Sequence, residues 1–171
     1  MPGSSPVYYW DACLFLAWMK DEERPTGEMD GVREIIDLSK KRDAIIMTSV
    51  LTSVEVLAAK IPVGMDTLFQ QLMRRVHRVG IDTKIVTLAH DIRNHYTKLG
   101  GKTVATPDAI HLATAIIYRV DEFHTFDQDG SRQSLGLIPL SGNVAGNRLA
   151  ICKPQAKRPQ LDLRKPKPSG K

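Results

Sequence analysis

Short apolar segments rich in β-favouring residues alternate with longer segments of helical periodicity along most of this 171-residue chain. The strands that this pattern predicts cover 7–10, 44–47, 122–126, 135–140 and 149–152. The helices that it predicts cover 12–20, 31–42, 50–60, 68–79, 85–96 and 106–117. Strands that alternate with helices favour parallel pairing, so we expect an α/β sandwich around a mainly parallel central sheet.

Two of these helices have predicted starts. Thr48 and Ser49 are expected to cap the helix that runs to about Lys60, because a hydroxyl can accept from the free N–H groups of a first turn. Thr106 is expected to cap the helix in which Pro107 takes the first position. Ligands of such sheets sit beyond the carboxyl ends of the strands, so residues at those ends are candidates for a site.

The end of the chain differs in composition from the rest. Residues 153–171 carry seven Lys or Arg, one acidic residue and four prolines. The net charge of the whole chain is +5, so the first 152 residues are close to neutral. We therefore predict one folded domain over 1–152 and a flexible basic Pro/Lys-rich tail over 153–171. The charge of the tail suits a polyanionic partner.

Several classes of protein are excluded by composition. The two cysteines, Cys13 and Cys152, have no zinc-like spacing and cannot form a secreted disulfide scaffold. The N-terminal residues lack the basic and apolar regions of a secretion signal. The longest apolar run near the start, 12–19, is too short to span a membrane. We expect a reduced, cytoplasmic protein without a membrane segment.

Four acidic residues with apolar neighbours are the candidates for chemistry: Asp11, Glu55, Asp108 and Asp127. Asp11 and Asp127 each follow a predicted strand, and Asp108 lies in the first turn of a predicted helix. Ionised carboxylates beside apolar groups are costly, and clustered carboxylates repel one another. A divalent cation with a preference for oxygen ligands, Mg²⁺ or Mn²⁺, removes both problems.

Each acid also has an ordinary structural interpretation. Asp108 could simply favour the start of its helix. Asp11 and Asp127 could be turn residues at strand ends. Glu55 could be a solvated helix residue, although its neighbours Val54 and Val56 leave it little polar surface. No one of these positions is decisive alone.

Four segments together resemble the PIN-domain family, in particular the VapC-type toxins of toxin–antitoxin pairs. They read Tyr-Trp-Asp-Ala-Cys-Leu-Phe at 9–15, Thr-Ser-Val-Leu-Thr-Ser-Val-Glu-Val-Leu at 48–57, Thr-Pro-Asp-Ala-Ile-His-Leu-Ala-Thr-Ala at 106–115 and Phe-His-Thr-Phe-Asp at 123–127. The third segment resembles the family most closely. Order and spacing agree over about 7–140, and the departures are Cys13, where Ser or Asn is common, and the basic tail.

The resemblance implies a PIN-like three-layer sandwich and a metal-dependent endoribonuclease. It implies Mg²⁺ or Mn²⁺ at the four acids, with Asp11 and Asp108 as direct ligands. Asp127 and Glu55 would act through water or as general bases, and the products would carry a 5′-phosphate and a 3′-hydroxyl. It also implies an RNA substrate, an antitoxin protein as partner and a homodimer.

Supporting residues follow from the same segments. Thr125 is expected to orient a carboxylate or a water through its hydroxyl, and Ser49 is a further supporting candidate. Asp129 could replace Asp127, because both follow the same predicted strand. For His111, three positions after Asp108, we expect a hydrogen-bonding role rather than metal ligation, because the site is rich in oxygen.

Four basic residues could contact a nucleic-acid backbone: Lys102, Arg74, Arg75 and Arg78. The three arginines could equally be a solvated helix face. The sequence Gly101-Lys102-Thr103 resembles the end of a phosphate-binding loop, but the required first glycine is replaced by Tyr96. We therefore reject a nucleotide-binding loop.

Two other functions compete with the nuclease. The first is a catalytically silent PIN-like module that binds RNA or a protein. The second, remote alternative is a haloacid-dehalogenase-type phosphatase, because Asp127-Gln-Asp-Gly-Ser resembles the nucleophile motif of that class. Only 44 residues follow Asp127, which is too few for the α/β domain that this class builds after its nucleophile.

Overall fold

The computed structural model describes residues 5–25 and 27–156 and contains one parallel sheet with the strand order β3-β2-β1-β4-β5. The strands are β1 (Val7–Trp10), β2 (Ile45–Ser49), β3 (His77–Val79), β4 (Glu122–His124) and β5 (Ile151–Cys152). All four strand pairings are parallel. The predicted α/β class with a parallel central sheet is therefore confirmed.

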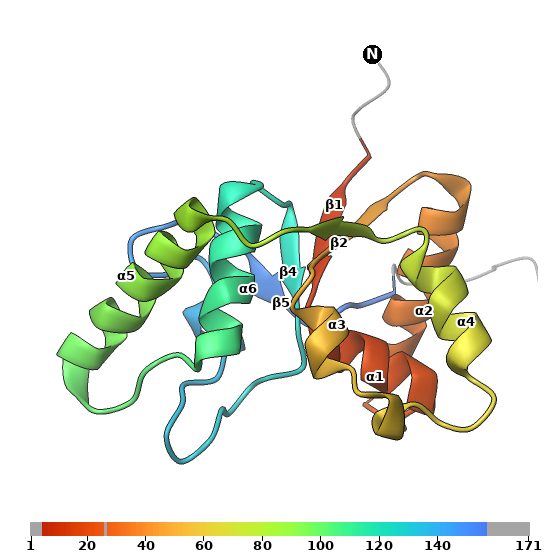
Figure 1. Cartoon of the computed structure of the whole chain (residues 1–171), viewed down its shortest axis with the longest axis horizontal. Coiled ribbons are helices and arrows are strands. Elements are labelled where there is room, and N and C mark those ends of the chain that lie inside the picture. Colours follow the sequence, from red (N-terminus) through yellow and green to blue (C-terminus); the bar gives the residue numbers. More distant parts are fainter. Residues whose placement is uncertain (1–4, 26, 157–171) are drawn as a thin grey trace, which may run out of the picture.

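Helices cover both faces of the sheet (Figure 1). The helices are α1 (Ala12–Lys20), α2 (Glu28–Lys41), α3 (Thr52–Glu55), α4 (Asp66–Met73), α5 (Thr83–Gly100) and α6 (Thr106–Ile117), with 3₁₀ turns η1 (Ala58–Lys60) and η2 (Ile138–Leu140). Figure 1 shows α5 and α6 on one side of the sheet and α1, α2 and α4 on the other. The three layers expected from the sequence are present.

The core is divided in two by the sheet, because successive strand side chains point to opposite faces. Tyr9 packs with α5 and α6, whereas Trp10 packs with α1, α2 and α4. Met47 belongs to the same core cluster as Tyr9, and Ile46 belongs to the same core cluster as Trp10. Tyr9, Trp10 and Ile46 are fully buried, which fixes the strand ends firmly in place. The site at those ends therefore rests on a rigid base.

Two predicted elements are wrong. The segment predicted as a helix over 68–79 is α4 followed by the edge strand β3, because Val79 pairs with Ser49 of β2. The segment predicted as a strand over 135–140 is a loop and η2. Its buried side chain, Leu137, packs into the core without strand pairing. The spacing of apolar residues alone does not distinguish a helix from an edge strand, or a strand from a loop with one buried side chain.

Both predicted helix caps are also wrong. Thr48 lies within β2, and its hydroxyl donates to the Trp10 carbonyl oxygen at 2.7 Å. Thr106 is the first residue of α6, and Ala105 occupies the cap position without a side-chain bond. The helix expected to run to Lys60 is only the four-residue α3, and η1 follows it.

The segment after β5 packs back on the start of α2. Lys153 Nζ contacts Glu28 Oε1 at 3.0 Å, and the Ala156 N–H donates to the Gly27 carbonyl oxygen at 3.4 Å. The first residues of the predicted tail therefore touch the domain, and 157–171 lie outside the described residues. The domain boundary at 152 stays a prediction. Within 5–25 and 27–156, no helix is long and apolar enough to cross a membrane.

Candidate active site

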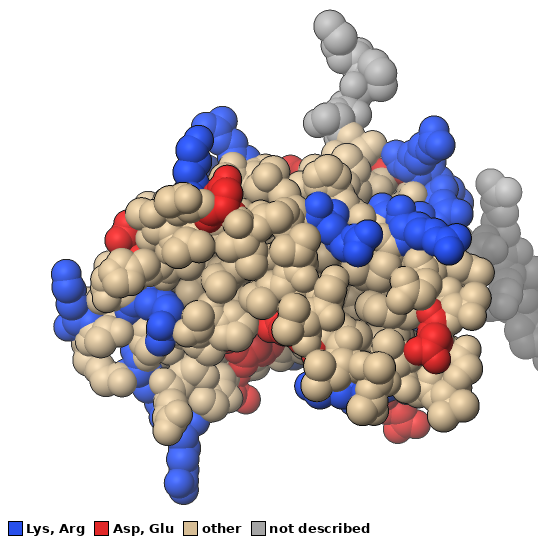
Figure 2. All heavy atoms as spheres, viewed as in Figure 1, with Lys and Arg blue, Asp and Glu red and all other residues tan. Residues whose placement is uncertain are grey.

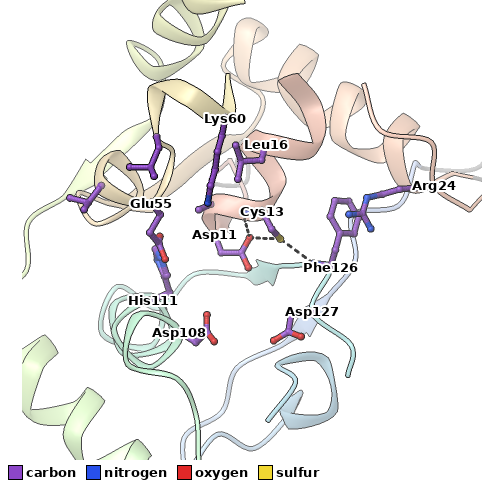
Figure 3. Close-up of a pocket in the computed structure, with 13 residues that line it drawn as sticks. Asp11, Cys13, Leu16, Arg24, Glu55, Lys60, Asp108, His111, Phe126 and Asp127 are labelled. Atoms are coloured by element: carbon purple, nitrogen blue, oxygen red, sulfur yellow. Dashed lines mark hydrogen bonds and ion pairs between the residues drawn. The ribbon is translucent and has the colours of Figure 1, made fainter. Parts of the chain in front are cut away.

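The four candidate acids meet in one open pocket of about 670 Å³ (Figure 3). Asp11 follows β1 directly, Asp127 lies on the loop after β4, Glu55 ends α3, and Asp108 is in the first turn of α6. The lining residues are Asp11, Ala12, Cys13, Leu16, Arg24, Val54, Glu55, Leu57, Lys60, Asp108, His111, Phe126 and Asp127. The chain thus brings together acids from four separate segments.

Asp11 is held on three sides. Its Oδ1 accepts from the Cys13 backbone N–H at 3.1 Å and from the Cys13 thiol at 2.7 Å. Its Oδ2 accepts from the Thr125 hydroxyl at 2.6 Å. A carboxylate has about four acceptor positions, so one position on Oδ2 stays available for a cation. Asp11 is only 7% exposed. The bond from Thr125 agrees with the orienting role expected from the sequence, and that role stays a prediction.

Burial and mutual repulsion oppose ionisation of these acids. Burial raises the pKa of Asp11, although the bonds from Cys13 and Thr125 act in the opposite direction. Burial also raises the pKa of Asp108 to about 6, with further increases from the charges of Asp11 and Asp127. A group of carboxylates that resists joint ionisation is the donor set that a divalent cation stabilises. The oxygen ligands present therefore fit Mg²⁺ or Mn²⁺.

Glu55 is oriented by a buried hydrogen-bonded pair. The His111 Nε2 lies 2.7 Å from Glu55 Oε2, and its Nδ1 lies 2.7 Å from the hydroxyl of Tyr9. His111 is 1% exposed and Tyr9 is fully buried. With the tyrosine hydroxyl as donor to Nδ1, the imidazole Nε2–H donates to the carboxylate. This arrangement gives His111 the hydrogen-bonding role that we expected, and Glu55 itself lines the pocket.

Asp127 belongs to a loop with internal bonds. Its N–H donates to the Thr125 hydroxyl at 3.1 Å, and its Oδ1 accepts from the Gly130 N–H at 2.9 Å. Its carbonyl oxygen accepts from the N–H groups of Leu137 and Ile138 at 3.0 Å. Thr125 thus contacts both Asp11 and the backbone of Asp127, so one hydroxyl links two of the four acids.

A family model for the PIN domain matches residues 8–134, which include all four acids. This chain belongs to the PIN-domain family. The match covers most of the chain and agrees with the resemblance seen in the four sequence segments. Among curated protein sequences, none matches this chain.

Three solved structures are similar to this PIN domain at low sequence identity. A toxin–antitoxin complex from Klebsiella pneumoniae has a TM-score of 0.55 and 15% identity, over 86% of this chain and 97% of that chain. VapBC2 from Rickettsia felis, bound to a promoter DNA fragment, has a TM-score of 0.52 and 13% identity, over 70% and 86%. FitAcB from Neisseria gonorrhoeae has a TM-score of 0.51 and 17% identity, over 70% and 87%. At these identities the likeness shows a shared fold.

The remaining predicted site residues of the PIN domain do not line the acidic pocket. Ser49 is buried at the end of β2, where its hydroxyl accepts from the Leu51 N–H at 3.1 Å. Asp129 is exposed and does not line the pocket. Lys102 donates to the Ser131 carbonyl oxygen at 3.0 Å. The role assigned to each of the three stays a prediction.

The three arginines of the predicted nucleic-acid surface do not line the acidic pocket either. Arg74 and Arg75 line a separate groove of about 370 Å³ beside α4, and Arg78 lies in β3. Figure 2 shows basic side chains gathered on the side of the molecule where α2 and α4 lie. An RNA contact at this surface would be remote from the acids.

Sequence reasoning did not select three residues at the rim of the pocket. Lys60 from η1 lines one wall, and Arg24 and Phe126 line the opposite side. The Arg24 guanidinium lies 3.7 Å from the centre of the Phe126 ring and pairs with Glu22 at 2.7 Å. Nothing in the sequence spacing of these three residues indicates a site. Arg24 and Phe126 meet because the loop before α2 lies against the loop after β4, and Lys60 comes from η1.

A second cluster of metal-ligating side chains is present outside the pocket. One ligand atom from each of Glu122, His124 and Cys152 lies within 4.8 Å of the others. The Trp10 indole N–H donates to His124 Nδ1 at 3.2 Å, so the proton of the neutral imidazole is on Nε2, 2.8 Å from Glu122 Oε2. A metal ion bound to Nε2 would displace the proton from that atom to Nδ1. The Nδ1–H would then point at the Trp10 indole N–H, which is also a donor. We therefore assign this cluster as a hydrogen-bonded group.

Proposed function

We propose that this PIN domain is a metal-dependent endoribonuclease and the toxin of a toxin–antitoxin pair. The observation that carries the proposal is the convergence of Asp11, Glu55, Asp108 and Asp127 on one pocket, with the pKa of Asp108 raised to about 6. Family membership and the fold shared with toxin–antitoxin complexes support it. The cation is proposed to be Mg²⁺ or Mn²⁺.

The four acids have two parts in the proposed hydrolysis. Asp11, through the open position on Oδ2, and Asp108 would hold the cation. When bound, the cation supplies Lewis-acid activation of the phosphate and of a water molecule. Glu55, oriented by His111, and Asp127 would accept the proton of the attacking water or bind the cation through water. The water oxygen bonds to phosphorus as the bond to O3′ breaks, and O3′ takes a proton from solvent, which leaves a 5′-phosphate and a 3′-hydroxyl.

The test is cleavage of a labelled random RNA library by protein freed of metal with EDTA and then supplied with Mg²⁺ or Mn²⁺. We expect cleavage only with added cation, and a loss of at least about 100-fold in Asp11→Asn and Asp108→Asn, since each removes a charge that holds the cation. Asp91→Asn, an exposed change in α5, is the matched control and should leave the rate unchanged. Undiminished cleavage in EDTA would refute the proposal.

A protein partner is part of the same proposal. The groove beside α4 has an apolar floor from Trp18, Ile36, Leu68 and Leu72 and a basic rim from Lys40, Arg74 and Arg75. An apolar segment with acidic flanks, such as part of an antitoxin, fits this chemistry. The domain also exposes Val63 and Leu68, so we propose a homodimer as well. Light scattering on a sizing column measures the mass, and a clean monomer at high concentration would contradict the dimer.

The catalytically silent module is the second candidate function. A binder of polyanions gains nothing from four carboxylates in a pocket. The phosphatase alternative has less support, because the described chain after Asp127 forms only η2 and the two-residue β5. Asp129, its expected acid, lies outside the pocket. RNA binding without metal-dependent cleavage would favour the silent module.

A further inference from the structure

We propose that Lys60 binds the scissile phosphate of the RNA, as a positive charge opposite the acids of the pocket. The proposal rests on the proposed nuclease function and adds a residue that neither the sequence motifs nor the family match assigns. In Figure 3 the Lys60 side chain extends into the pocket from the wall that also carries Glu55, and its nitrogen lies on the pocket side. Asp108 and Asp127 lie across the pocket from it.

A break in the chain allows Glu55 and Lys60 to share this wall. In a continuous α-helix, residues five positions apart point about 140° away from each other. Here α3 ends at Glu55, Val56 has a ψ of 82° and Leu57 is extended, before η1 carries Lys60 back to the pocket. The break therefore places an acid and a cation on the same pocket.

The break buries one apolar side chain and exposes two others. Val56 is 6% exposed and packs in the core with residues of α1, α2 and α4, whereas Val54 and Leu57 are 68% and 52% exposed. Core packing therefore accounts for the position of Val56. It does not require the lysine that follows in η1, whose side chain extends into the pocket.

Lys60 is also free of partners within the described residues. Lys153 contacts Glu28, Lys40 contacts Asp37 and Lys102 contacts a carbonyl oxygen, whereas the Lys60 ammonium has no hydrogen bond or ion pair there.

The ionisation of Asp11 and Asp108 is governed mainly by groups other than this lysine. The largest influences on the pKa values of Asp11 and Asp108 come from burial, neighbouring acids, hydrogen bonds and His111, and Lys60 is not among them. Its charge therefore remains available for an anionic ligand.

The chemistry of the pocket gives that charge a use. Four carboxylates repel a phosphate, and a single divalent cation offsets only part of their charge. A lysine ammonium is a compact charge with three donors that can contact a non-bridging phosphate oxygen. Charge on those oxygens is stabilised in the transition state by donors fixed in advance. Lys60 would thus contact the substrate itself.

The experiment compares Lys60→Met, Lys60→Gln and Lys60→Arg with the control Lys84→Met, an exposed change at the start of α5. For each protein, kcat, KM, the salt dependence of KM and the Mn²⁺ concentration for half-maximal rate are measured on the labelled random RNA library. Thermal unfolding in EDTA confirms that each variant is folded. Cleavage by the wild-type protein is measured first, because its absence would refute the proposed nuclease function rather than the role of Lys60.

We expect kcat/KM to fall about 100-fold in Lys60→Met and Lys60→Gln, the order found for loss of one donor to a developing oxyanion. The slope of log KM against log salt should fall by about 0.7, because one phosphate contact is lost. Lys60→Arg should recover most of the rate, and Lys84→Met should match the wild type.

Two results would overturn the role of Lys60. One is a rate within twofold of wild type in both Lys60→Met and Lys60→Gln. The other is a change confined to unfolding temperature and Mn²⁺ half-saturation, with full rate at saturating Mn²⁺, which would mean that Lys60 only offsets the charge of the acids.

Discussion

Replacing Asp108 with Asn should stabilise the metal-free protein while abolishing cleavage. The pKa of Asp108 rises from 3.8 to about 6 because of burial and the charges of Asp11 and Asp127. Each unit corresponds to about 1.4 kcal/mol, so ionising this group in the folded protein costs about 3 kcal/mol. Asn keeps the volume, and losing the favourable carboxylate at the start of α6 subtracts roughly 0.5 kcal/mol. Partial exposure reduces the cost further, so we expect a net gain of about 2 kcal/mol at pH 7.5.

The stability gained by Asp108→Asn should increase as the pH rises. A raised pKa means that the folded protein holds the proton more tightly than the unfolded chain. The wild type is therefore not penalised below about pH 4 and loses stability as the pH rises to about 6, the folded pKa. Asp108→Asn has no such group, so its advantage should be under about 1 kcal/mol at pH 4 and reach a plateau above pH 6.5.

The assay is urea unfolding in EDTA at pH 4 and pH 7.5, with Asp91→Asn as the control that should show no pH-dependent gain. Adding Mn²⁺ should reverse the order, because a ligand that binds the folded wild type stabilises it by mass action. A gain that is equal at both pH values, or a loss of stability at pH 7.5, would refute the electrostatic reasoning. Near-normal cleavage by Asp108→Asn would refute the catalytic assignment.

Three further changes test other contacts. Thr125→Val removes the hydroxyl that donates to Asp11, so cleavage should fall at least tenfold and Thr125→Ser should restore it, in the same RNA assay. Gly31→Ala places a Cβ 2.6 Å from the backbone of 154–155, so urea unfolding should show a loss of about 1–3 kcal/mol that disappears in a chain ending at 152. Burial and Asp11 raise the pKa of the Cys13 thiol well above its usual value, so iodoacetamide at pH 8 should label it more than tenfold slower than in urea; equal rates would contradict this.

The parts of the site that follow strand ends could be predicted from the sequence. Asp11 comes directly after a run of β-favouring residues that ends in a fully buried Trp10. Asp127 lies on the loop that follows β4, and parallel strands bring their carboxyl ends to one edge of the sheet. Asp108 was found because a proline marks the start of its helix. These signals are local, so a single sequence contains them.

The parts that depend on distant contacts could not be predicted. β3 has only three residues and exists through its pairing with β2, while Val76 and Val79 fit helical spacing equally well. The break after Glu55 has no glycine or proline before Pro62 to signal it. Lys60 reaches the pocket only because of that break, so the sequence alone does not indicate it as a site residue.

The strand order also determines when during synthesis this protein could become active. β1 lies at the centre of the sheet between β2 and β4, and β4 is paired in turn with β5 at residues 151–152. The acid cluster therefore contains residues from early and late in the chain, and such non-local pairing forms slowly. A nascent chain that has Asp11 and Glu55 but not yet Asp127 lacks part of the proposed catalytic set. On the proposed function, a ribosome making this protein is thus exposed to a competent nuclease only after nearly the whole domain has emerged.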